Sequence, residues 1–467
     1  MNPLKKLLSL LAFSAALTPT SGIAQPVVYT NISSGWTPAD QTGFYKLNQG
    51  SELIPYAWLK VLREPDGQFF MRDSLKRYGF IPNEFSKTPN APIGFSLANG
   101  EVGVTCAACH TRQVQVGSTA YRIDGGPALI DFQSFLSDLD KAVGYVLNNP
   151  AAFQQFAKDE LASAYDATTV AALKKKLTAW YTPSHALISR ALPPSPWGTG
   201  RLDAITMIYD RLSGLDIGLP ENGYIIPENI KVADAPVRFP FVWNASKQDL
   251  TQWVGFANNG DDGLAALRNQ GEVFGVFGKF HPVKGKNGVS YRAINSTNFA
   301  GLNSAETYVK KIPSPKWLWS TDPALVAQGK TLFEKNCSTG CHEKTAGVTR
   351  WLFQQTWKTP VIDVGTDIHQ WAIAKSQVKT GLLQGEEVPF LKIKLKETDA
   401  ALYVLETAAY GSIIKDSYVG GWIDWVGKAL EPLWPIRTLP TDYPYESRVL
   451  EGIWAAAPYL HNGSVPS

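Results

Sequence analysis

The sequence is poor in the residue types that most often bind metals or form covalent cross-links. Its 467 residues include four cysteines, six histidines and three methionines. A disulfide framework would spread cysteines through a small secreted chain, whereas these four form two close pairs in a long one. The net charge of +3, from 44 Lys and Arg against 41 Asp and Glu, gives no case for a nucleic acid or a strongly acidic partner. The cysteines are therefore the first place to look for chemistry.

Each cysteine pair is followed directly by a histidine. The first motif is Cys106-Ala107-Ala108-Cys109-His110, and the second, one residue longer, is Cys337-Ser338-Thr339-Gly340-Cys341-His342. Two thiols followed at once by an imidazole are typical of haem c attachment, in which the thiols bind the porphyrin and the imidazole binds the iron. A zinc site built from both pairs is an alternative, but tetrahedral zinc does not need a histidine after each pair. The motifs predict two covalently bound haem c groups, with His110 and His342 on the irons.

Few side chains remain as a second axial ligand for either iron. The candidates outside the motifs and the N-terminal methionine are His185, His281, His369, His461, Met71 and Met207. A plain electron carrier usually has six strong ligands on each iron, which would use two of these residues, whereas an iron with an open position binds dioxygen or peroxide. For any one of these histidines, an ordinary surface or core position is the better prediction.

The N-terminus predicts export. Lys5 and Lys6 precede an apolar run from Leu7 to Leu17, and small residues up to Ala24 fit a signal peptidase site. A membrane anchor is the alternative, but this run is roughly half as long as a bilayer-spanning helix, and no later stretch is both long and apolar enough to span. We expect a signal peptide over residues 1–24 and a mature protein without a membrane span in the periplasm, where haem c is attached after export.

Length and patterning predict the architecture. About 440 residues remain after export, too many for one core. Residues 151–164 and 168–181 form Ala-rich amphipathic runs, and Asp322 is a suitable cap for a helix that starts at Pro323 and leads into Cys337. We expect a mainly α fold of two cytochrome c-like haem domains, residues 25–315 and 316–467, with long loop-rich insertions and little β structure.

Some residues outside the motifs are candidates for the haem environment. Arg122 is placed to form a two-pronged hydrogen bond with a haem propionate, although a surface role is the more common fate of such an arginine. Trp253 is a candidate for the electron path between the irons. Phe256, Phe274 and Phe277 are candidates for an apolar substrate pocket, with ordinary core packing as the alternative for each.

The C-terminal run Gly452–Pro466 resembles the second-domain signature of the diheme cytochrome c peroxidase superfamily. In detail the run is closer to the branch that holds the diheme rubber oxygenase, and the segments Gly103–Thr105, Ile123–Pro127 and Gln252-Trp253 also look like this branch. The resemblance covers nearly all of the mature chain. It implies haem-dependent chemistry with peroxide or dioxygen.

The sequence departs from that resemblance at two points. Well-studied peroxidases of the superfamily carry a histidine shortly after the first motif, which covers the reactive iron until reduction, whereas here none follows His110 until His185. An N-terminal haem that is already open is therefore expected. Relatives also continue beyond this C-terminal run with a histidine for the second haem, so we expect either a fragment or a distal ligand from His369 or His461.

We therefore predict a periplasmic diheme oxidoreductase, peroxidase-like or oxygenase-like, that activates a small-molecule oxidant at the N-terminal haem. A small redox partner such as a cytochrome c would exchange electrons with the second haem. The alternative is an electron-transfer cytochrome with no substrate of its own.

Overall fold

The computed structural model describes residues 26–286, 288–350, 354–389, 391–415 and 443–466. The predicted signal peptide, residues 1–24, lies outside these ranges. Within them, no helix combines the length and the apolar character that crossing a bilayer requires.

Twelve α-helices lie in the described ranges. The amphipathic runs around residues 151–164 and 168–181 are α5 and α6, so both helix predictions are confirmed. The helices are α1 (Pro38–Tyr45), α2 (Tyr56–Leu59), α3 (Cys106–Cys109), α4 (Phe132–Asn148), α5 (Pro150–Leu161), α6 (Ala167–Ala191), α7 (Ala204–Arg211), α8 (Asp262–Gly275), α9 (Phe299–Lys311), α10 (Pro323–Phe333), α11 (His369–Ala374) and α12 (Ala401–Tyr410).

The prediction of a mainly α fold with little β structure was wrong. The described residues contain twenty short strands in nine sheets of two or three strands each. The sheets are β1 (Val27–Tyr29), β6 (Thr119–Asp124) and β5 (Thr111–Val116); β2 (Ile54–Pro55), β4 (Glu101–Val104) and β3 (Phe95–Ala98); β7 (Arg201–Leu202) and β8 (Val237–Arg238); β9 (Leu250–Thr251) and β10 (Ala257–Asn258); β11 (Phe280–Gly285) and β12 (Gly288–Asn295); β13 (Ala346–Thr349) and β14 (Gln355–Trp357); β15 (Val361–Ile362) and β20 (Tyr445–Glu446); β16 (Gln377–Lys379) and β19 (Thr398–Ala400); β17 (Glu387–Val388) and β18 (Ile393–Lys394).

The hairpin of β5 and β6 illustrates why this β structure forms. Its strands pair from Thr111 with Asp124 to Val116 with Thr119. Between them Gly117 adopts a φ of +59°, which a tight hairpin turn requires and which glycine adopts without strain. Most of the other strands have only two to four residues. A period of two cannot be recognised over so few positions, so the sequence pattern does not separate these strands from loops.

Three hydrophobic cores hold the body together. One lies under α4 and α6, a second among α7, α8 and α12, and a third beside the first cysteine motif. The second core combines Ile208 with Leu405, residues from either side of position 315. The division into domains 25–315 and 316–467 stays a prediction.

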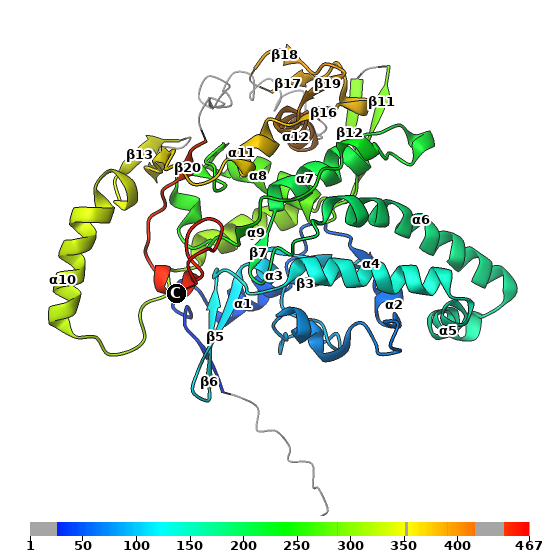
Figure 1. Ribbon diagram of the computed structural model, residues 1–467, viewed down its shortest axis with the longest axis horizontal. Helices are drawn as coiled ribbons and strands as arrows, with labels where there is room; N and C mark the ends of the chain where they lie inside the picture. Colours follow the sequence, from blue (N-terminus) through cyan, green and yellow to red (C-terminus); the bar gives the residue numbers. More distant parts are fainter. Residues whose placement is uncertain (1–25, 287, 351–353, 390, 416–442, 467) are drawn as a thin grey trace, which may run out of the picture.

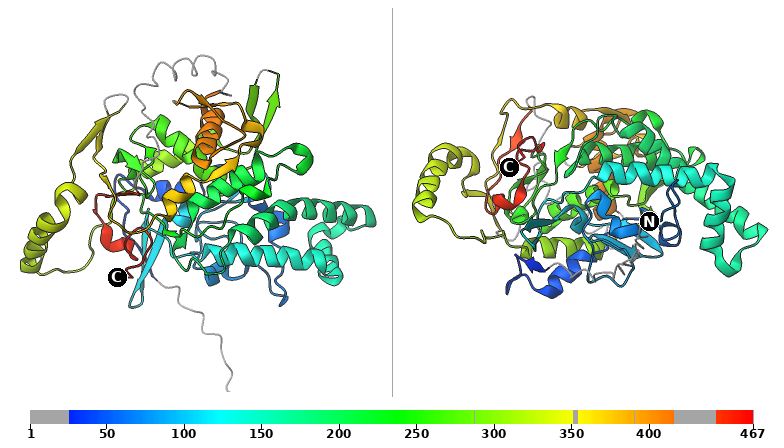
Figure 2. Two further views of the ribbon diagram at one scale, coloured as in Figure 1. Left: turned by 45° about the horizontal axis from the view of Figure 1, so that its top comes forward. Right: turned by 60° about the horizontal axis from the view of Figure 1, so that its bottom comes forward.

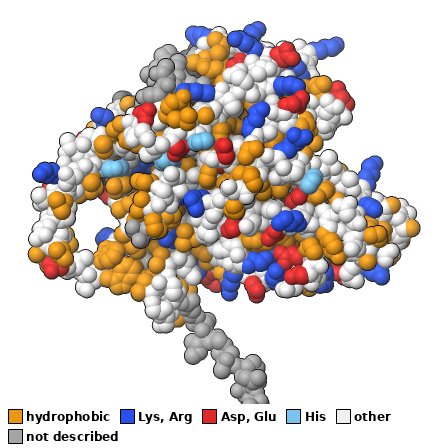
Figure 3. All heavy atoms as spheres, in the orientation of Figure 1, with side chains coloured by type: hydrophobic (Ala, Val, Ile, Leu, Met, Phe, Trp, Pro, Cys, Tyr) orange, Lys and Arg blue, Asp and Glu red, His pale blue; other side chains and the backbone are white. Residues whose placement is uncertain are grey.

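Helix α10 and its flanking chain, residues 316–350, form an arm that stands away from the body (Figures 1 and 2). The Asp322 side chain accepts hydrogen bonds from the backbone N–H groups of Ala324 and Leu325, and Pro323 occupies the first turn, so the predicted cap is confirmed. The side chains of Leu325 and Leu332 are 65% and 60% exposed. Figure 3 shows an opening between this arm and the body. Exposed apolar side chains that lie together are typical of a surface that binds an apolar group.

Candidate functional site

The first cysteine motif lies inside the body. Strand β4 leads into α3, where Ala107 and Ala108 are almost fully buried. Gly94, with a φ of +80°, passes so close that a Cβ there would lie 2.0 Å from the backbone nitrogen of Ala108. Only glycine fits at this position, and its close approach fixes the turn that carries both thiols.

His110 is held by its backbone-facing nitrogen. Its Nδ1 lies 2.9 Å from the Pro240 carbonyl oxygen, which can only accept, so Nδ1 carries the proton. Burial lowers the pKa of His110 to about 4, although the Pro240 carbonyl opposes this effect. The neutral ring therefore leaves Nε2 unprotonated, which is the form that binds iron.

Burial also raises the pKa of the two thiols, Cys106 and Cys109, to about 12, and the charge of Glu272 adds to the effect. The Cys106 Sγ lies 3.1 Å from Gln49 Oε1 and donates to it. Backbone contacts connect the helix of Glu272 to this motif: Gln49, which accepts from Cys106, lies three residues before Glu52, whose N–H donates to the Phe277 carbonyl just after α8.

The second cysteine motif lies on the arm. A π-helical turn, Glu334–His342, carries it, and the additional residue is accommodated because Gly340 adopts a φ of +78°. Cys337 is exposed. His342 Nδ1 lies 2.7 Å from the Arg448 carbonyl oxygen, so this ring also donates through Nδ1, and Nε2 is the nitrogen left for the iron.

A path of hydrogen bonds and short backbone segments links the two histidines. The Pro240 carbonyl that binds His110 lies two residues from Arg238, whose carbonyl accepts from Trp253 Nε1 at 3.1 Å. The Trp253 carbonyl accepts from the backbone N–H of Glu446 at 2.8 Å. Glu446 lies two residues before Arg448, whose carbonyl binds His342. Trp253 is thus the side chain in the middle of this path.

Three arginines surround the path, and one buried acid lies among them. Burial, and then the charges of Arg448 and Arg112, lower the pKa of Arg238 to about 9. The charge of Arg448 also lowers the pKa of His110. Glu446 lies 3.3 Å from Arg448. Among the described residues, Nε of Arg112 and Nη1 of Arg448 are buried without a hydrogen-bond partner. One carboxylate oxygen of Glu446, Oε2, is likewise buried without a partner in the described part of the chain, so the cluster holds both unpartnered donors and an unpartnered acceptor.

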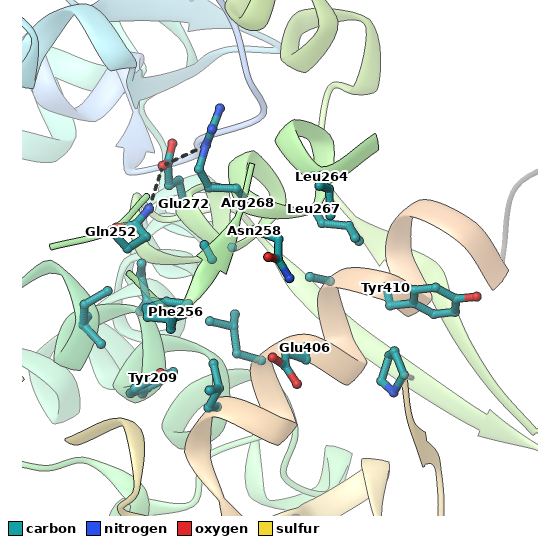
Figure 4. A pocket seen from close by; sticks show the side chains of 18 residues that line it. Tyr209, Gln252, Phe256, Asn258, Leu264, Leu267, Arg268, Glu272, Glu406 and Tyr410 are labelled. Atoms are coloured by element: carbon teal, nitrogen blue, oxygen red, sulfur yellow. Dashed lines mark hydrogen bonds and ion pairs between the residues drawn. The ribbon is translucent and has the colours of Figure 1, made fainter. Parts of the chain in front are cut away.

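A cavity with an empty volume of about 890 Å³, its mouth included, lies among α7, α8 and α12 (Figure 4). The space inside it that water-sized molecules can occupy is about 130 Å³. Glu272, Arg268 and Gln252 lie together at one end. Gln252 Nε2 donates to Glu272 Oε1 at 3.2 Å, and Arg268 Nε lies 3.9 Å from the same oxygen. Burial raises the pKa of Glu272, opposed by Arg268 and Gln252.

The phenylalanines predicted for a pocket lie in different environments. Phe256 lines the cavity. Phe274 is buried and packs on Phe280, with ring centroids 4.7 Å apart. Phe277 adopts a φ of +69°, and the Arg211 guanidinium lies 5.3 Å from its ring centroid.

The other predicted site residues already have protein partners. Arg122 donates to Gln113 Oε1 from two nitrogens, at 3.0 and 2.7 Å, and lies 3.5 Å from Glu84. His369 and His461 line a second, more polar cavity. His461 Nε2 contacts an Asp367 carboxylate oxygen, and His369 Nδ1 lies 3.7 Å from Asp234 Oδ1.

The acids and arginines of the site could not be predicted from the sequence. Arg268 and Glu272 have the four-residue spacing of a surface ion pair on a helix, so nothing in the pattern distinguishes them from solvated charges. Arg448 lies two residues after a short strand near the C-terminus. Arg448 reaches Gln248, 200 positions earlier, only because the chain folds back on itself.

Comparison with known proteins bears on the class of protein. Residues 444–467 match the family described as RoxA-like, cytochrome c-like. The chain is 26% identical over 504 residues to the uncharacterized protein y4iJ of Sinorhizobium fredii (strain NBRC 101917 / NGR234), covering 94% of this chain and 79% of the relative. It is 23% identical over 286 residues to the uncharacterized protein y4iM of the same strain, covering 60% of this chain and 52% of that relative.

The family match supports a RoxA-like cytochrome, and a cytochrome c-like domain binds haem c covalently. It also indicates an extracytoplasmic protein. The wider likeness to the diheme cytochrome c peroxidase superfamily stays a prediction.

Proposed function

We propose that this protein is a periplasmic diheme oxidoreductase whose first haem reacts with peroxide and whose second haem relays electrons to it. One observation carries the proposal. The histidines of both motifs donate through Nδ1 to a backbone carbonyl, but Glu272, with Arg268 and Gln252, lies near the first motif. This asymmetry supports proton chemistry at the first haem.

The residues present fit two haems. Each motif supplies two thiols and an imidazole whose Nδ1 donates to a backbone carbonyl, which leaves Nε2 for the iron. The unpartnered donors of Arg112 and Arg448 suit haem propionates, whose two negative charges would balance the excess of cations in the cluster. The apolar side chains exposed on the arm suit the faces of the second porphyrin. Haem, when bound, supplies an iron that activates peroxide or dioxygen.

Glu272 is the proton carrier in this proposal. Its carboxylate would take the proton from one oxygen of hydrogen peroxide and return it to the other, which would leave as water. Two electrons from the redox partner and two protons from solvent would convert the remaining oxygen to a second water. Arg268, ion-paired to Glu272, would stabilise the negative charge that develops as the O–O bond breaks. Gln252 holds Glu272 in place through its amide N–H.

Trp253 is the proposed electron path. Its indole N–H and its own carbonyl connect the segment that binds His110 with the segment that binds His342. The Arg238 guanidinium lies 4.7 Å from its ring centroid, which fixes the ring and disfavours a positive charge on it. The second motif lies on an exposed arm, which favours electron entry there from a small redox protein such as a cytochrome c.

Dioxygen activation is the second candidate. The cavity beyond Glu272 is lined largely by apolar side chains, as an oxygenase acting on an apolar substrate needs. A carrier with two six-coordinate haems remains the alternative without a substrate.

The test combines haem content with rapid kinetics. An intact mass should show two covalent haems, and stopped-flow mixing of the holoprotein with peroxide should oxidise a reduced c-type cytochrome. Reaction of the reduced protein with dioxygen and an apolar substrate, without reaction with peroxide, would favour the second candidate. Two haems that bind neither cyanide nor carbon monoxide would contradict both enzymatic functions.

A further inference from the structure

The cavity has a second polar end, away from Glu272. Glu406 of α12 and Tyr209 of α7 line it there (Figure 4). Most of the wall between the two ends is apolar and buried, and includes Ile208, Leu264 and Leu405. A cavity that bound hydrocarbon alone would not need a carboxyl and a phenol in its wall.

One oxygen of each of these two side chains lacks a hydrogen-bond partner. Among the described residues, Oε2 of Glu406 and the hydroxyl of Tyr209 are buried without a hydrogen bond. Such groups cost free energy unless something in the cavity satisfies them. The two side chains form one group, because both line the same end of the cavity.

Glu406 is uncharged in this environment. Burial raises its pKa to about 8, so the carboxyl carries its proton near neutral pH and can donate a hydrogen bond. Tyr209 can donate as well, and each oxygen can accept. Together they can serve a neutral group that both accepts and donates, whereas an anionic group would meet a site without a described cation beside it.

We propose that the end of the cavity formed by Tyr209 and Glu406 binds the single hydroxyl or carbonyl group of an otherwise apolar, neutral substrate. The apolar wall holds the body of that substrate, which extends toward Glu272. This proposal rests on the proposed function only in calling the ligand a substrate. Binding itself requires neither peroxide nor turnover.

A matched ligand pair tests the proposal. 4-Butylphenol and butylbenzene differ by one hydroxyl, and isothermal titration of the oxidised holoprotein, without peroxide, gives both dissociation constants. The wild-type protein should bind the phenol about tenfold more tightly, as expected for satisfying buried polar groups. Glu406→Leu should abolish this preference with little effect on butylbenzene, and Tyr209→Phe, which removes one oxygen, should reduce it.

Two controls keep the outcome interpretable. Glu397→Gln changes an exposed acid outside the cavity and should leave the preference intact. An unchanged Soret spectrum establishes that each variant keeps its haems. Equal affinities in the wild-type protein, or an undiminished preference in both cavity variants, would overturn the proposal. A preference without any peroxide reaction would leave this site standing and contradict the peroxidase function instead.

Discussion

The two motif sites share one hydrogen bond and differ in nearly everything around it. In both, histidine Nδ1 donates to a backbone carbonyl at 2.7 to 2.9 Å. The first site is half-buried in the body, with Ala107 and Ala108 fully packed, whereas the second lies on an arm with exposed apolar side chains and has one exposed thiol, Cys337. The same attachment motif thus lies in one environment suited to a chemical reaction and in another suited to contact with a redox partner. The surroundings, more than the motif, distinguish their roles.

Removing one haem at a time should have the largest effect on the difference between the two sites. Replacing Cys106 and Cys109 by serine should cost one haem, lower the melting temperature markedly and bring the peroxide reaction below detection, because this site is built into the core. Replacing Cys337 and Cys341 should also cost one haem, but should leave a single turnover with peroxide. Intact mass, thermal unfolding and stopped-flow spectra measure these effects. Equal losses in both variants would contradict the division of roles.

Glu272→Gln tests whether the acid near the first haem moves protons. The peroxide reaction should slow about 10²- to 10⁴-fold without loss of haem, because general acid–base catalysis contributes on this scale. Glu306→Gln is the matched control, since Glu306 also pairs with Arg268, at 2.9 Å, but does not line the cavity. Stopped-flow rates measure both. Equal losses would mean that the ion-pair network only supports the structure.

Trp253→Phe tests the link between the two sites. It removes the N–H that binds the Arg238 carbonyl and should slow electron transfer from the second haem to the first several-fold, with both haems retained. Flash reduction followed at the two haem bands measures this rate. Trp357→Phe, in a small sheet near the arm, should leave it unchanged. An unaltered rate in Trp253→Phe would place the electron path elsewhere.

A smaller effect concerns the pH dependence of stability. The pKa of Glu406 is raised to about 8 in the folded protein, against roughly 4.3 when unfolded. The stabilisation that Glu406 gives to the folded state is therefore fully present below about pH 4 and is lost as pH rises through about 8. The free energy of unfolding falls by at most about 1.4 kcal/mol per pH unit in this range, and by less where the cavity admits water. Glu406→Gln should flatten this decline in the free energy of unfolding, measured by denaturant titration at several pH values.

The exposed acid Glu334 on the arm supplies the contrast. Glu334→Gln should leave the pH profile unchanged, because its side chain is 59% exposed. An identical profile in the wild type and Glu406→Gln would contradict the buried, protonated carboxyl.

The sequence allowed prediction where the chemistry is local. The Asp322 cap and the helices α5 and α6 follow from neighbouring residues and are confirmed. The many short strands escaped prediction because two or three residues show no periodicity, and their pairing depends on distant partners. The haem motifs and Trp253 stay predictions, although their surroundings agree with the roles proposed.

The acids of the cavity could not be found from the sequence. Glu406 lies in an apolar run and Glu272 in an ordinary helical ion pair. The role of each acid depends on its burial and on residues over a hundred positions away in the sequence. No local pattern records that environment.

Cyanide titration of the oxidised holoprotein, with each haem resolved by electron paramagnetic resonance, tests the central claim most directly. We expect that one haem of two binds cyanide, that this capacity disappears with Cys106 and Cys109, and that it survives loss of Cys337 and Cys341. Cyanide binding at the second haem alone would contradict it.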